Sequence, residues 1–236
     1  MKTHKIGTAD VELTDEIGSY FSVIRAVAAG NSKLSAIAAA LGTKATSLTS
    51  YLKTLIDLEI IEREVPVTED TPEKSKKGLY KIRDNYIRFW FAFVYPNQRL
   101  IESGNEKIVM QKIKSGFVAN HAAFVYEDVC REKMWDMNAA GTWPFHFLKI
   151  GRYWSGDSEI DIAALDPDGP NLILGECKYW REPVGASVLR ELEEKAATVP
   201  WHKGQRKLWY VLFSVSGFTE ELQEQVKHRE DVILRT

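Results

Sequence analysis

The first half of the chain has an apolar pattern typical of three consecutive helices. In each predicted helix the apolar residues recur every three or four positions, which gathers them on one face. Ser32 can cap the second helix, and Gly42-Thr43-Lys44 predicts a three-residue turn before the third. The apolar stripes consist of Phe21, Ile24, Val27 and Ala28 within residues 17–29, Leu34, Ile37, Ala38 and Leu41 within 33–41, and Leu48, Leu52 and Leu55 in the third helix.

Two short β-rich segments follow these helices and predict a hairpin. Residues 60–67 (IIEREVPV) and 78–82 (GLYKI) have strand character, and the polar segment between them is rich in turn residues. Two helices joined by a glycine-containing turn and followed by a hairpin form the pattern of a winged helix-turn-helix. We therefore predict such a domain over residues 15–95, and a linker over 96–114, where turn residues interrupt the apolar rhythm.

The second half alternates between helical and β-rich segments and predicts an α/β domain over residues 115–236. The turn signal DPDG joins two of the predicted strands into a hairpin. Helices are predicted over 117–135 and 188–199, strands over 145–154, 159–166, 171–180 and 207–214, and closing elements over 218–226 and 232–234. We expect the first helix to bury Phe117, Phe124, Val125, Val129 and Trp135.

Composition excludes several classes of protein. A length of 236 residues fits one large domain or two small ones, at about 150 residues per domain. The 31 basic and 33 acidic residues give a net charge of −2, unlike a basic nucleic-acid coat or a highly charged disordered chain. The longest apolar run, residues 89–95, is much shorter than the roughly 20 residues of a membrane span, and the N-terminus does not resemble a signal peptide.

The two cysteines, Cys130 and Cys177, lie in apolar-rich segments and lack the spacing of a metal site. We expect two buried thiols in a reducing, cytoplasmic compartment. A single disulfide is the alternative.

The charge distribution favours DNA binding by the first domain. Residues 17–56 contain no acidic residue, although they carry four basic ones. The third helix and the predicted wing expose side chains able to contact phosphates or base edges. The predicted DNA-binding residues are Lys44, Ser47, Thr49, Ser50, Lys53, Lys74, Lys76 and Lys77. The alternative is a helical module for protein contacts with solvated lysines.

The predicted hairpin gathers charged residues at one end. Because side chains alternate along a strand, Glu176 and Lys178 lie on one face with Cys177 opposite, and Asp161 shares a face with Glu159 on the partner strand. Charged residues at the end of an apolar strand are costly to bury unless they are paired or bound to metal. Two convergent carboxylates are suited to Mg²⁺, and a nearby lysine can orient or deprotonate a water and stabilise charge on a phosphate.

This arrangement resembles the PD-(D/E)XK nuclease superfamily, which has a restriction-endonuclease-like α/β fold with a mixed central sheet. The matching positions are Asp161, the triplet Glu176-Cys177-Lys178 and Glu127 on the preceding helix. The resemblance implies that Asp161 and Glu176 bind Mg²⁺ or Mn²⁺, that Lys178 positions the water, and that Glu127 binds a second metal or its water shell. The proline of the family motif is absent, since Ile160 precedes Asp161. A salt-bridged surface hairpin is the alternative.

A closer likeness covers residues 15–236, most specifically the segments FWFAFVYP and GECKYW. It looks like the C-terminal half of archaeal-type (DEXX-box) AAA-class ATPases, in which a winged helix joins a PD-(D/E)XK-like domain of unknown function. The family's ATPase domain carries a G-x-x-x-x-G-K-[ST] loop, which this chain lacks, so we expect no ATP site here. The chain is then either a free-standing protein or one piece of a longer one.

Two hypotheses follow. The leading one is a Mg²⁺-dependent nuclease tethered to a DNA-binding winged helix, with duplex DNA as the favoured partner, no membrane partner, and a symmetric homodimer suited to double-strand cleavage. The second is a non-catalytic DNA- or protein-binding module that works with an AAA ATPase in cis or in trans.

Overall fold

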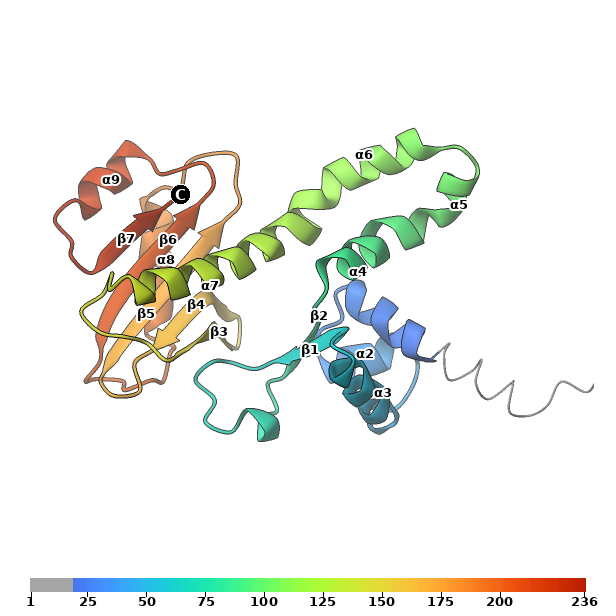
Figure 1. The fold of residues 1–236 in the computed structure, drawn as a ribbon, viewed down its shortest axis with the longest axis horizontal. Coiled ribbons are helices and arrows are strands. Elements are labelled where there is room, and N and C mark those ends of the chain that lie inside the picture. The colour runs from blue at the N-terminus through green and yellow to red at the C-terminus, as the bar shows by residue number, and fades with distance from the viewer. Residues whose placement is uncertain (1–18) are drawn as a thin grey trace, which may run out of the picture. The chain divides into compact units, whose positions relative to one another are not determined.

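The computed structural model describes residues 19–236, so the predicted start of the first domain at residue 15 lies outside the described part (Figure 1). The described chain forms two compact units. The first contains residues 19–64 and 77–115, and the second contains residues 65–76 and 116–236. Within residues 19–236 no helix combines the length and apolarity needed to cross a membrane.

The first unit begins with three helices and a small antiparallel sheet. Residues 19–28 are helical, followed by α2 (Leu34–Ala40), α3 (Ala45–Asp57) and the paired strands β1 (Ile61–Glu64) and β2 (Leu79–Ile82). The predicted stripes of α2 and α3 meet in one core, because each helix turns its three- and four-residue-spaced apolar face inward. The first helix contributes Val23, Ala26 and Val27 to this core, whereas Phe21 of its predicted stripe is not part of it. The most buried members of this core include Val23, Ile37, Leu52, Leu55 and Ile61. Gly30 and Gly42 adopt positive φ where the first two helices end, a backbone that glycine tolerates.

A succession of helical segments completes the first unit. The elements are α4 (Asn85–Phe89), the π-helix η2 (Trp90–Val94), the 3₁₀ turn η3 (Tyr95–Asn97), α5 (Gln98–Glu102) and α6 (Glu106–Phe117). Residues 96–114, predicted as a linker, are therefore largely helical. Aromatic residues of segment 89–95 pack around Phe21, whose ring centroid lies 5.1 Å from that of Phe91 and 5.0 Å from that of Tyr95.

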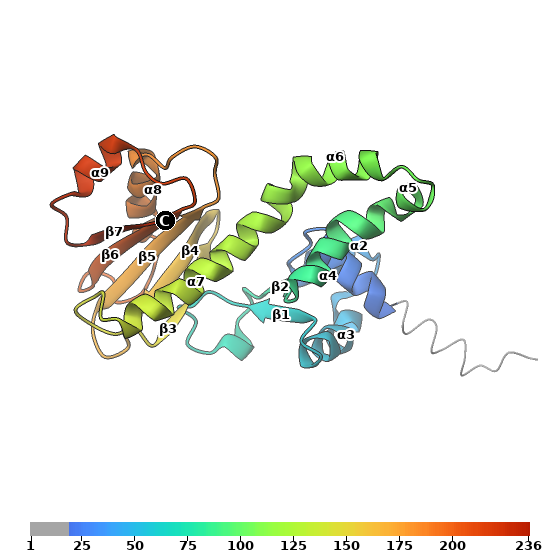
Figure 2. The same ribbon diagram turned by 45° about the horizontal axis from the view of Figure 1, so that its top comes forward.

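The second unit is built on a mixed sheet of five strands in the order β3-β4-β5-β6-β7 (Figure 2). β3, β4 and β5 pair antiparallel, and β5, β6 and β7 pair parallel. The strands are β3 (Lys149–Ser155), β4 (Ser158–Leu165), β5 (Asn171–Lys178), β6 (Lys207–Ser214) and β7 (Val232–Arg235), and the helical elements are η1 (Pro72–Lys74), η4 (Val118–Ala122), α7 (Ala123–Ala139), α8 (Ala186–Ala196) and α9 (Glu220–Val226). The structure confirms the prediction of an α/β protein with a mixed central sheet.

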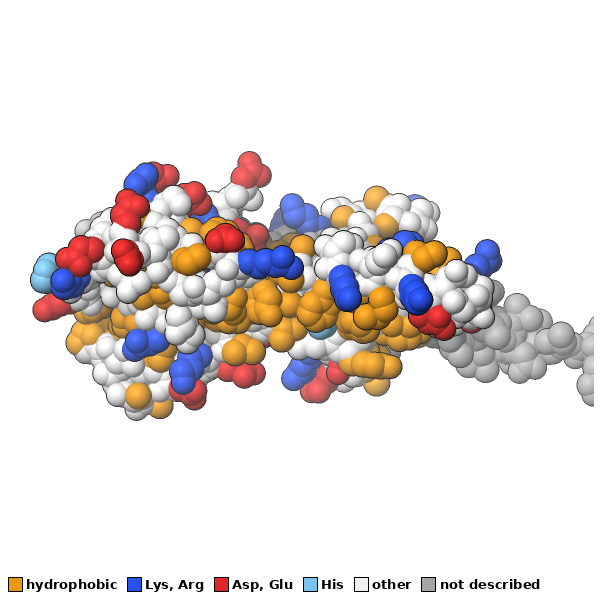
Figure 3. Space-filling model, turned by 90° about the horizontal axis from the view of Figure 1, so that it is seen from above, with side chains coloured by type: hydrophobic (Ala, Val, Ile, Leu, Met, Phe, Trp, Pro, Cys, Tyr) orange, Lys and Arg blue, Asp and Glu red, His pale blue; other side chains and the backbone are white. Residues whose placement is uncertain are grey.

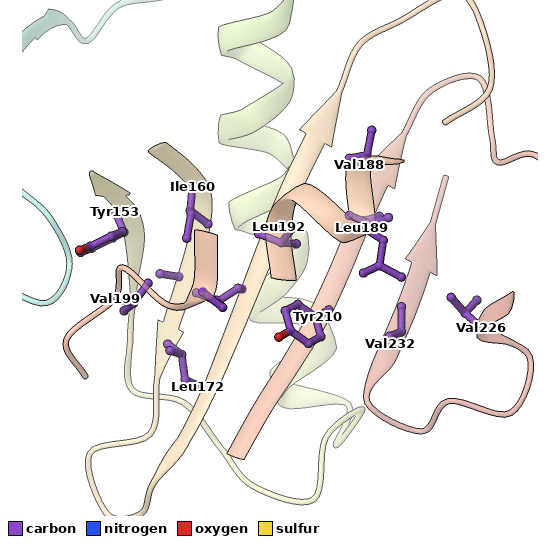
Figure 4. Close-up of a cluster of buried hydrophobic side chains, with 14 of the residues drawn as sticks. Tyr153, Ile160, Leu172, Val188, Leu189, Leu192, Val199, Tyr210, Val226 and Val232 are labelled. Carbon is purple, nitrogen blue, oxygen red and sulfur yellow. The ribbon is translucent and has the colours of Figure 1, made fainter. Parts of the chain in front are cut away.

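Helices cover both faces of this sheet. Leu189 and Leu192 of α8 pack with Leu172 of β5 on one face, as the close-up of this cluster shows (Figure 4). Cys130 and Met134 of α7 pack on the other face. The alternation of side chains along β4 and β5 supplies both clusters, which explains why these strands read as nearly continuous apolar runs.

The buried face of α7 differs from the predicted one. Phe124, Val129 and Trp135 of α7 are exposed, as is Phe117 at the end of α6. Apolar side chains reach the surface on the face of the molecule seen in Figure 3. The helix instead buries residues spaced by four and three, namely Cys130, Met134 and Met137. The sequence offers apolar residues on more than one side of this helix, and only packing against the sheet selects between them.

The segment between β1 and β2 belongs to the second unit. The Val67 amide donates to the Arg152 carbonyl oxygen at 2.9 Å, and the Lys149 ammonium donates to the Glu69 carbonyl oxygen at 2.9 Å. Val67 packs closely over Gly151, where a Cβ would lie 3.2 Å from the Val67 Cβ. The segment thus covers part of the edge strand β3 and protects it from pairing elsewhere.

Gly175 tests the close packing of the central strands. A Cβ built on this residue would lie 2.7 Å from Val211 Cγ1 and 3.0 Å from the Val211 carbonyl oxygen. We expect Gly175→Ala to lower the free energy of unfolding by about 1–3 kcal/mol, because the core cannot accept the added methyl group without backbone shifts. Chemical denaturation measures this change.

Gly185→Ala is the matched control, because its Cβ would meet nothing closer than 3.9 Å. It should cost less than about 1 kcal/mol, the loss expected at a helix N-cap. Equal destabilisation by the two substitutions would contradict the tight packing at Gly175.

Candidate active site

Asp161 and Glu176 lie at the same end of the β4–β5 hairpin. The last pair of this antiparallel ladder is Ile162 with Gly175, so the two acids are the next residues beyond it on each strand. The Cys177 amide donates to Asp161 Oδ2 at 2.9 Å, which fixes the carboxylate against β5. The structure therefore brings together the two acids that the sequence pattern placed at one site.

Glu176 is the most buried charged residue of this group, with 3% of its surface exposed. Each carboxylate oxygen is paired with a different lysine. Lys178 Nζ lies 2.5 Å from Oε2, and Lys195 Nζ from α8 lies 2.7 Å from Oε1. A buried carboxylate needs this compensation, because an unpaired charge in the interior is strongly unfavourable.

Lys178 lies between the two acids. Its ammonium is 4.0 Å from Asp161 Oδ2 as well as 2.5 Å from Glu176 Oε2. The same ammonium lies 5.7 Å from the centroid of the half-exposed Trp180 ring. A cation thus occupies the position between the carboxylates, and an aromatic ring borders it.

A bulge in β4 interrupts the strict alternation assumed from the sequence. Gly151 pairs with Ala163 and Tyr153 pairs with Ile160, so Asp161 and Ile162 together oppose Arg152. Ile160 and Ala163 accordingly pack in the same core cluster, although an odd spacing would place them on opposite faces of a regular strand. Bulges bend a strand and re-aim its side chains, and this one lies at the candidate acid.

Glu127 approaches the acids from α7. Its Oε2 lies 3.9 Å from Arg131 Nη1 and 3.9 Å from Arg152 Nε. Arg131 also donates to the Asp161 main-chain oxygen at 3.2 Å and pairs with Asp128. The helix glutamate is therefore near the pair of acids, inside a network of arginine contacts.

The electrostatic surroundings shift the pKa values of the two acids in opposite directions. Burial, together with the charges of Glu176 and Glu127, raises the pKa of Asp161 to about 7, against the opposing effects of Lys178 and the Cys177 amide. Burial also acts to raise the pKa of Glu176, but Lys178 and Lys195 outweigh it and the pKa is lowered. Glu176 is consequently ionised at neutral pH, whereas Asp161 titrates there.

Lys178 is held in its charged form. Burial alone would lower its pKa, but the charges of Glu176 and Asp161 outweigh this effect and the pKa is raised. At neutral pH the side chain is an ammonium that can donate hydrogen bonds and stabilise negative charge.

No set of three or more His, Cys, Asp and Glu side chains within residues 19–236 forms a ready-made metal cluster. The donor set of Asp161 and Glu176 nevertheless suits a hard cation, since Mg²⁺ is bound by one or two carboxylates with waters and phosphate oxygens completing its shell. The Lys178 ammonium between them acts as a resident positive charge. These two carboxylates fit a divalent ion bound beside this charge.

The predicted DNA-binding residues are all exposed. On α3 they lie away from the face that buries Leu48, Leu52 and Leu55. Lys44 precedes the helix at its N-cap position. The side chains on the outer surface are Lys44, Ser47, Thr49, Ser50, Lys53, Lys74, Lys76 and Lys77. Lys74 and Lys76 belong to the second compact unit, whereas the others belong to the first.

Lys195 was not among the predicted site residues, although it lies in the helix predicted over residues 188–199. The sequence feature that could have identified it is its position beside the buried stripe of α8, next to Ala196 and three residues after Leu192. A lysine at that border can extend along the helix to the sheet. The identity of its partner depends on how α8 crosses the strands, and the sequence alone does not contain that information.

The two cysteines are buried and free, as expected. A hydrogen bond with the Cys130 thiol, together with burial, raises the pKa of Cys177. Both pack between α7 and the sheet. They contribute to the core beneath the candidate site.

Residues 90–197 match DUF234, a family described as archaeal and bacterial proteins of unknown function. This stretch includes the candidate acids and both lysines. The chain is also similar to the uncharacterized protein MJECL04 of Methanocaldococcus jannaschii, with 40% identity over 168 residues. That alignment covers 71% of the chain and 37% of the relative, so the chain spans well under half of the relative's length. No solved structure matches the chain.

Asp161→Asn should change the pH dependence of stability. Because burial and neighbouring acids raise the Asp161 pKa from 3.8 to about 7, the folded state binds more protons than the unfolded state between these values. Wild-type stability attributable to this group therefore falls as pH rises through that window. We expect the free energy of unfolding of the variant, relative to that of wild type, to rise from pH 4 to pH 7 by at most a few kcal/mol. Above this range the difference should level off.

Denaturation in the presence of a chelator measures this difference without interference from metal. Glu224→Gln, on the exposed side of α9, is the control and should show no such trend. A stability difference between Asp161→Asn and wild type that stays constant with pH would contradict the raised pKa of Asp161.

Proposed function

We propose that the chain is a metal-dependent DNA nuclease, with a restriction-endonuclease-like second domain and a winged helix-turn-helix that binds DNA. The observation that carries this proposal is the meeting of Asp161, Glu176 and Lys178 at the end of two antiparallel strands. Glu127 approaches the same point from a helix, as the resemblance to PD-(D/E)XK nucleases leads one to expect. Strand order and the mixed pairing of the sheet are consistent with that fold.

Asp161 and Glu176 would hold Mg²⁺ or Mn²⁺, with Glu127 acting through a second ion or its water shell. When bound, the ion supplies a Lewis acid that polarises the phosphate and lowers the pKa of its water. The acids position this chemistry through rigid supports. Asp161 is fixed by the Cys177 amide, and Glu176 is held at one oxygen by Lys178.

Lys178 would orient the attacking water and stabilise charge on the phosphate. Its raised pKa favours the role of a cation over that of a base, because an ammonium cannot accept a proton. Fixed positive charge aimed at a developing oxyanion is among the largest contributions to catalysis. Lys178 is thus the residue whose charge matters most to the proposed reaction.

The first unit would supply affinity for DNA. Its α3 presents short polar side chains and lysines on the surface opposite its buried face, as a recognition helix does. Phosphate contacts by Lys44 and Lys53 would position the duplex without reading its sequence. Such binding weakens steeply as salt increases, because it releases counterions.

A second candidate function is a non-catalytic module that works with an AAA ATPase in cis or in trans. Two observations favour it. Both Glu176 oxygens are already satisfied by lysines, as in a structural ion-pair network. The alignment also covers only 37% of the Methanocaldococcus relative, so that relative has further residues outside the aligned part, and a module of this kind would work with such a part.

Cleavage assays separate the two functions. Wild-type protein with Mg²⁺ or Mn²⁺ should cut plasmid, linear or branched DNA, and Glu176→Gln and Lys178→Met should each lower the rate by roughly 100-fold or more. Glu224→Gln and Lys227→Met alter an exposed pair and serve as controls of unchanged activity. Equal cleavage by wild type and both site variants would exclude this mechanism, and no cleavage by wild type would favour the non-catalytic module.

DNA binding by the first unit is tested by Lys44→Ala combined with Lys53→Ala. The loss of two phosphate contacts should reduce affinity and flatten the slope of log affinity against log salt concentration by about 1.8. Fluorescence anisotropy with labelled duplex DNA, in chelator to prevent cleavage, gives both quantities. An unchanged slope would assign this surface to protein contacts.

A further inference from the structure

We propose that Lys195 is a positioning residue that neutralises Glu176 in the metal-free protein and yields its carboxylate oxygen when a divalent ion binds. This inference rests on the proposed function, because it assumes an ion at Asp161 and Glu176. It concerns a residue on α8 that neither the acid–lysine pattern nor the family match assigns. Lys195 thereby sets the affinity of the site for metal.

The first support is the geometry of Glu176. Its two oxygens have separate cationic partners, Lys178 on its own strand and Lys195 on α8. An ion that coordinates Glu176 must therefore compete with at least one of these ammonium groups. The carboxylate is almost fully buried, so it needs a positive partner both in the metal-free and in the metal-bound protein.

The second support is the different placement of the two lysines. Lys178 reaches both acids, at 2.5 Å from Glu176 and 4.0 Å from Asp161. Within residues 19–236, Lys195 forms an ion pair with Glu176 alone, and its side chain remains partly exposed. Lys195 can therefore move to solvent without leaving Asp161 uncompensated.

The third support is the rigidity of the helix that carries Lys195. Leu189 and Leu192 of α8 are fully buried against the sheet, so the backbone beneath Lys195 is fixed. The Thr198 hydroxyl donates to the Lys195 main-chain oxygen at 2.7 Å and closes the end of the helix. A change in the ion pair then requires only rotation of the lysine side chain.

Removal of this competing charge should raise metal affinity. We expect Lys195→Gln, which can still donate a hydrogen bond to Glu176, to bind Mn²⁺ on the order of tenfold more tightly than wild type. Lys195→Met should shift affinity in the same direction, and Lys195→Arg should remain near wild type because it keeps the charge. Lys227→Met, which breaks an exposed lysine–glutamate pair at 3.1 Å, is the matched control and should change nothing.

Mn²⁺ titration followed by electron paramagnetic resonance measures the affinities. A second readout is the modification of Lys195 by an amine-reactive ester, quantified by mass spectrometry. In wild type the modification of Lys195 should rise severalfold when Mn²⁺ is added, whereas that of Lys227 should not change. A purely structural lysine would show neither response.

The outcomes distinguish this inference from the proposed function. If Mn²⁺ binds wild type but Lys195→Gln has the same affinity and the modification of Lys195 is unchanged, the role of Lys195 is refuted and the metal site stands. If Mn²⁺ binds neither wild type nor any Lys195 variant, the metal site and the role of Lys195 are both refuted. Tighter binding by Lys195→Gln together with metal-dependent exposure of Lys195 supports both.

Discussion

The burial of Glu176 at the end of β5 is the constraint on which the candidate site depends. A carboxylate with 3% exposure must be compensated, and the fold does so from two directions, with Lys178 on the same strand and Lys195 on the helix that covers the sheet. The neighbouring Asp161 receives less compensation, and its pKa rises to about 7. The site therefore carries one firmly ionised acid and one that titrates at neutral pH. An additional cation would relieve the remaining repulsion among the acids.

The architecture explains how these groups meet. Antiparallel pairing of β4 with β5 brings Asp161 beside Glu176, and parallel pairing of β5 with β6 requires a crossover, which α8 provides. The crossover helix packs its apolar face on the sheet and delivers Lys195 to the far oxygen of Glu176. On the opposite face α7 carries Glu127 and Arg131 towards Asp161. Each face of the sheet thus contributes one helix to the charge network.

Much of this could be predicted from the sequence, for physical reasons that are local. The DPDG turn and the apolar strands on either side of it fix the hairpin, and strand periodicity then places Glu176 and Lys178 together. The bulge at Asp161 and the reach of Lys195 could not be predicted, because both depend on pairing and packing between distant segments. The buried face of α7 was misassigned for the same reason. Its choice of Cys130, Met134 and Met137 over Phe124 and Trp135 is made by the sheet beneath it.

The proposed function depends on a divalent-cation site formed by Asp161 and Glu176, with Lys178 beside it. Anomalous diffraction from crystals of the full chain soaked with Mn²⁺ tests this most directly. We predict an anomalous peak within coordination distance of both carboxylates, with the Lys178 ammonium beside it. A well-diffracting crystal with Lys178 and Lys195 still paired to Glu176 and no peak at this position would contradict it.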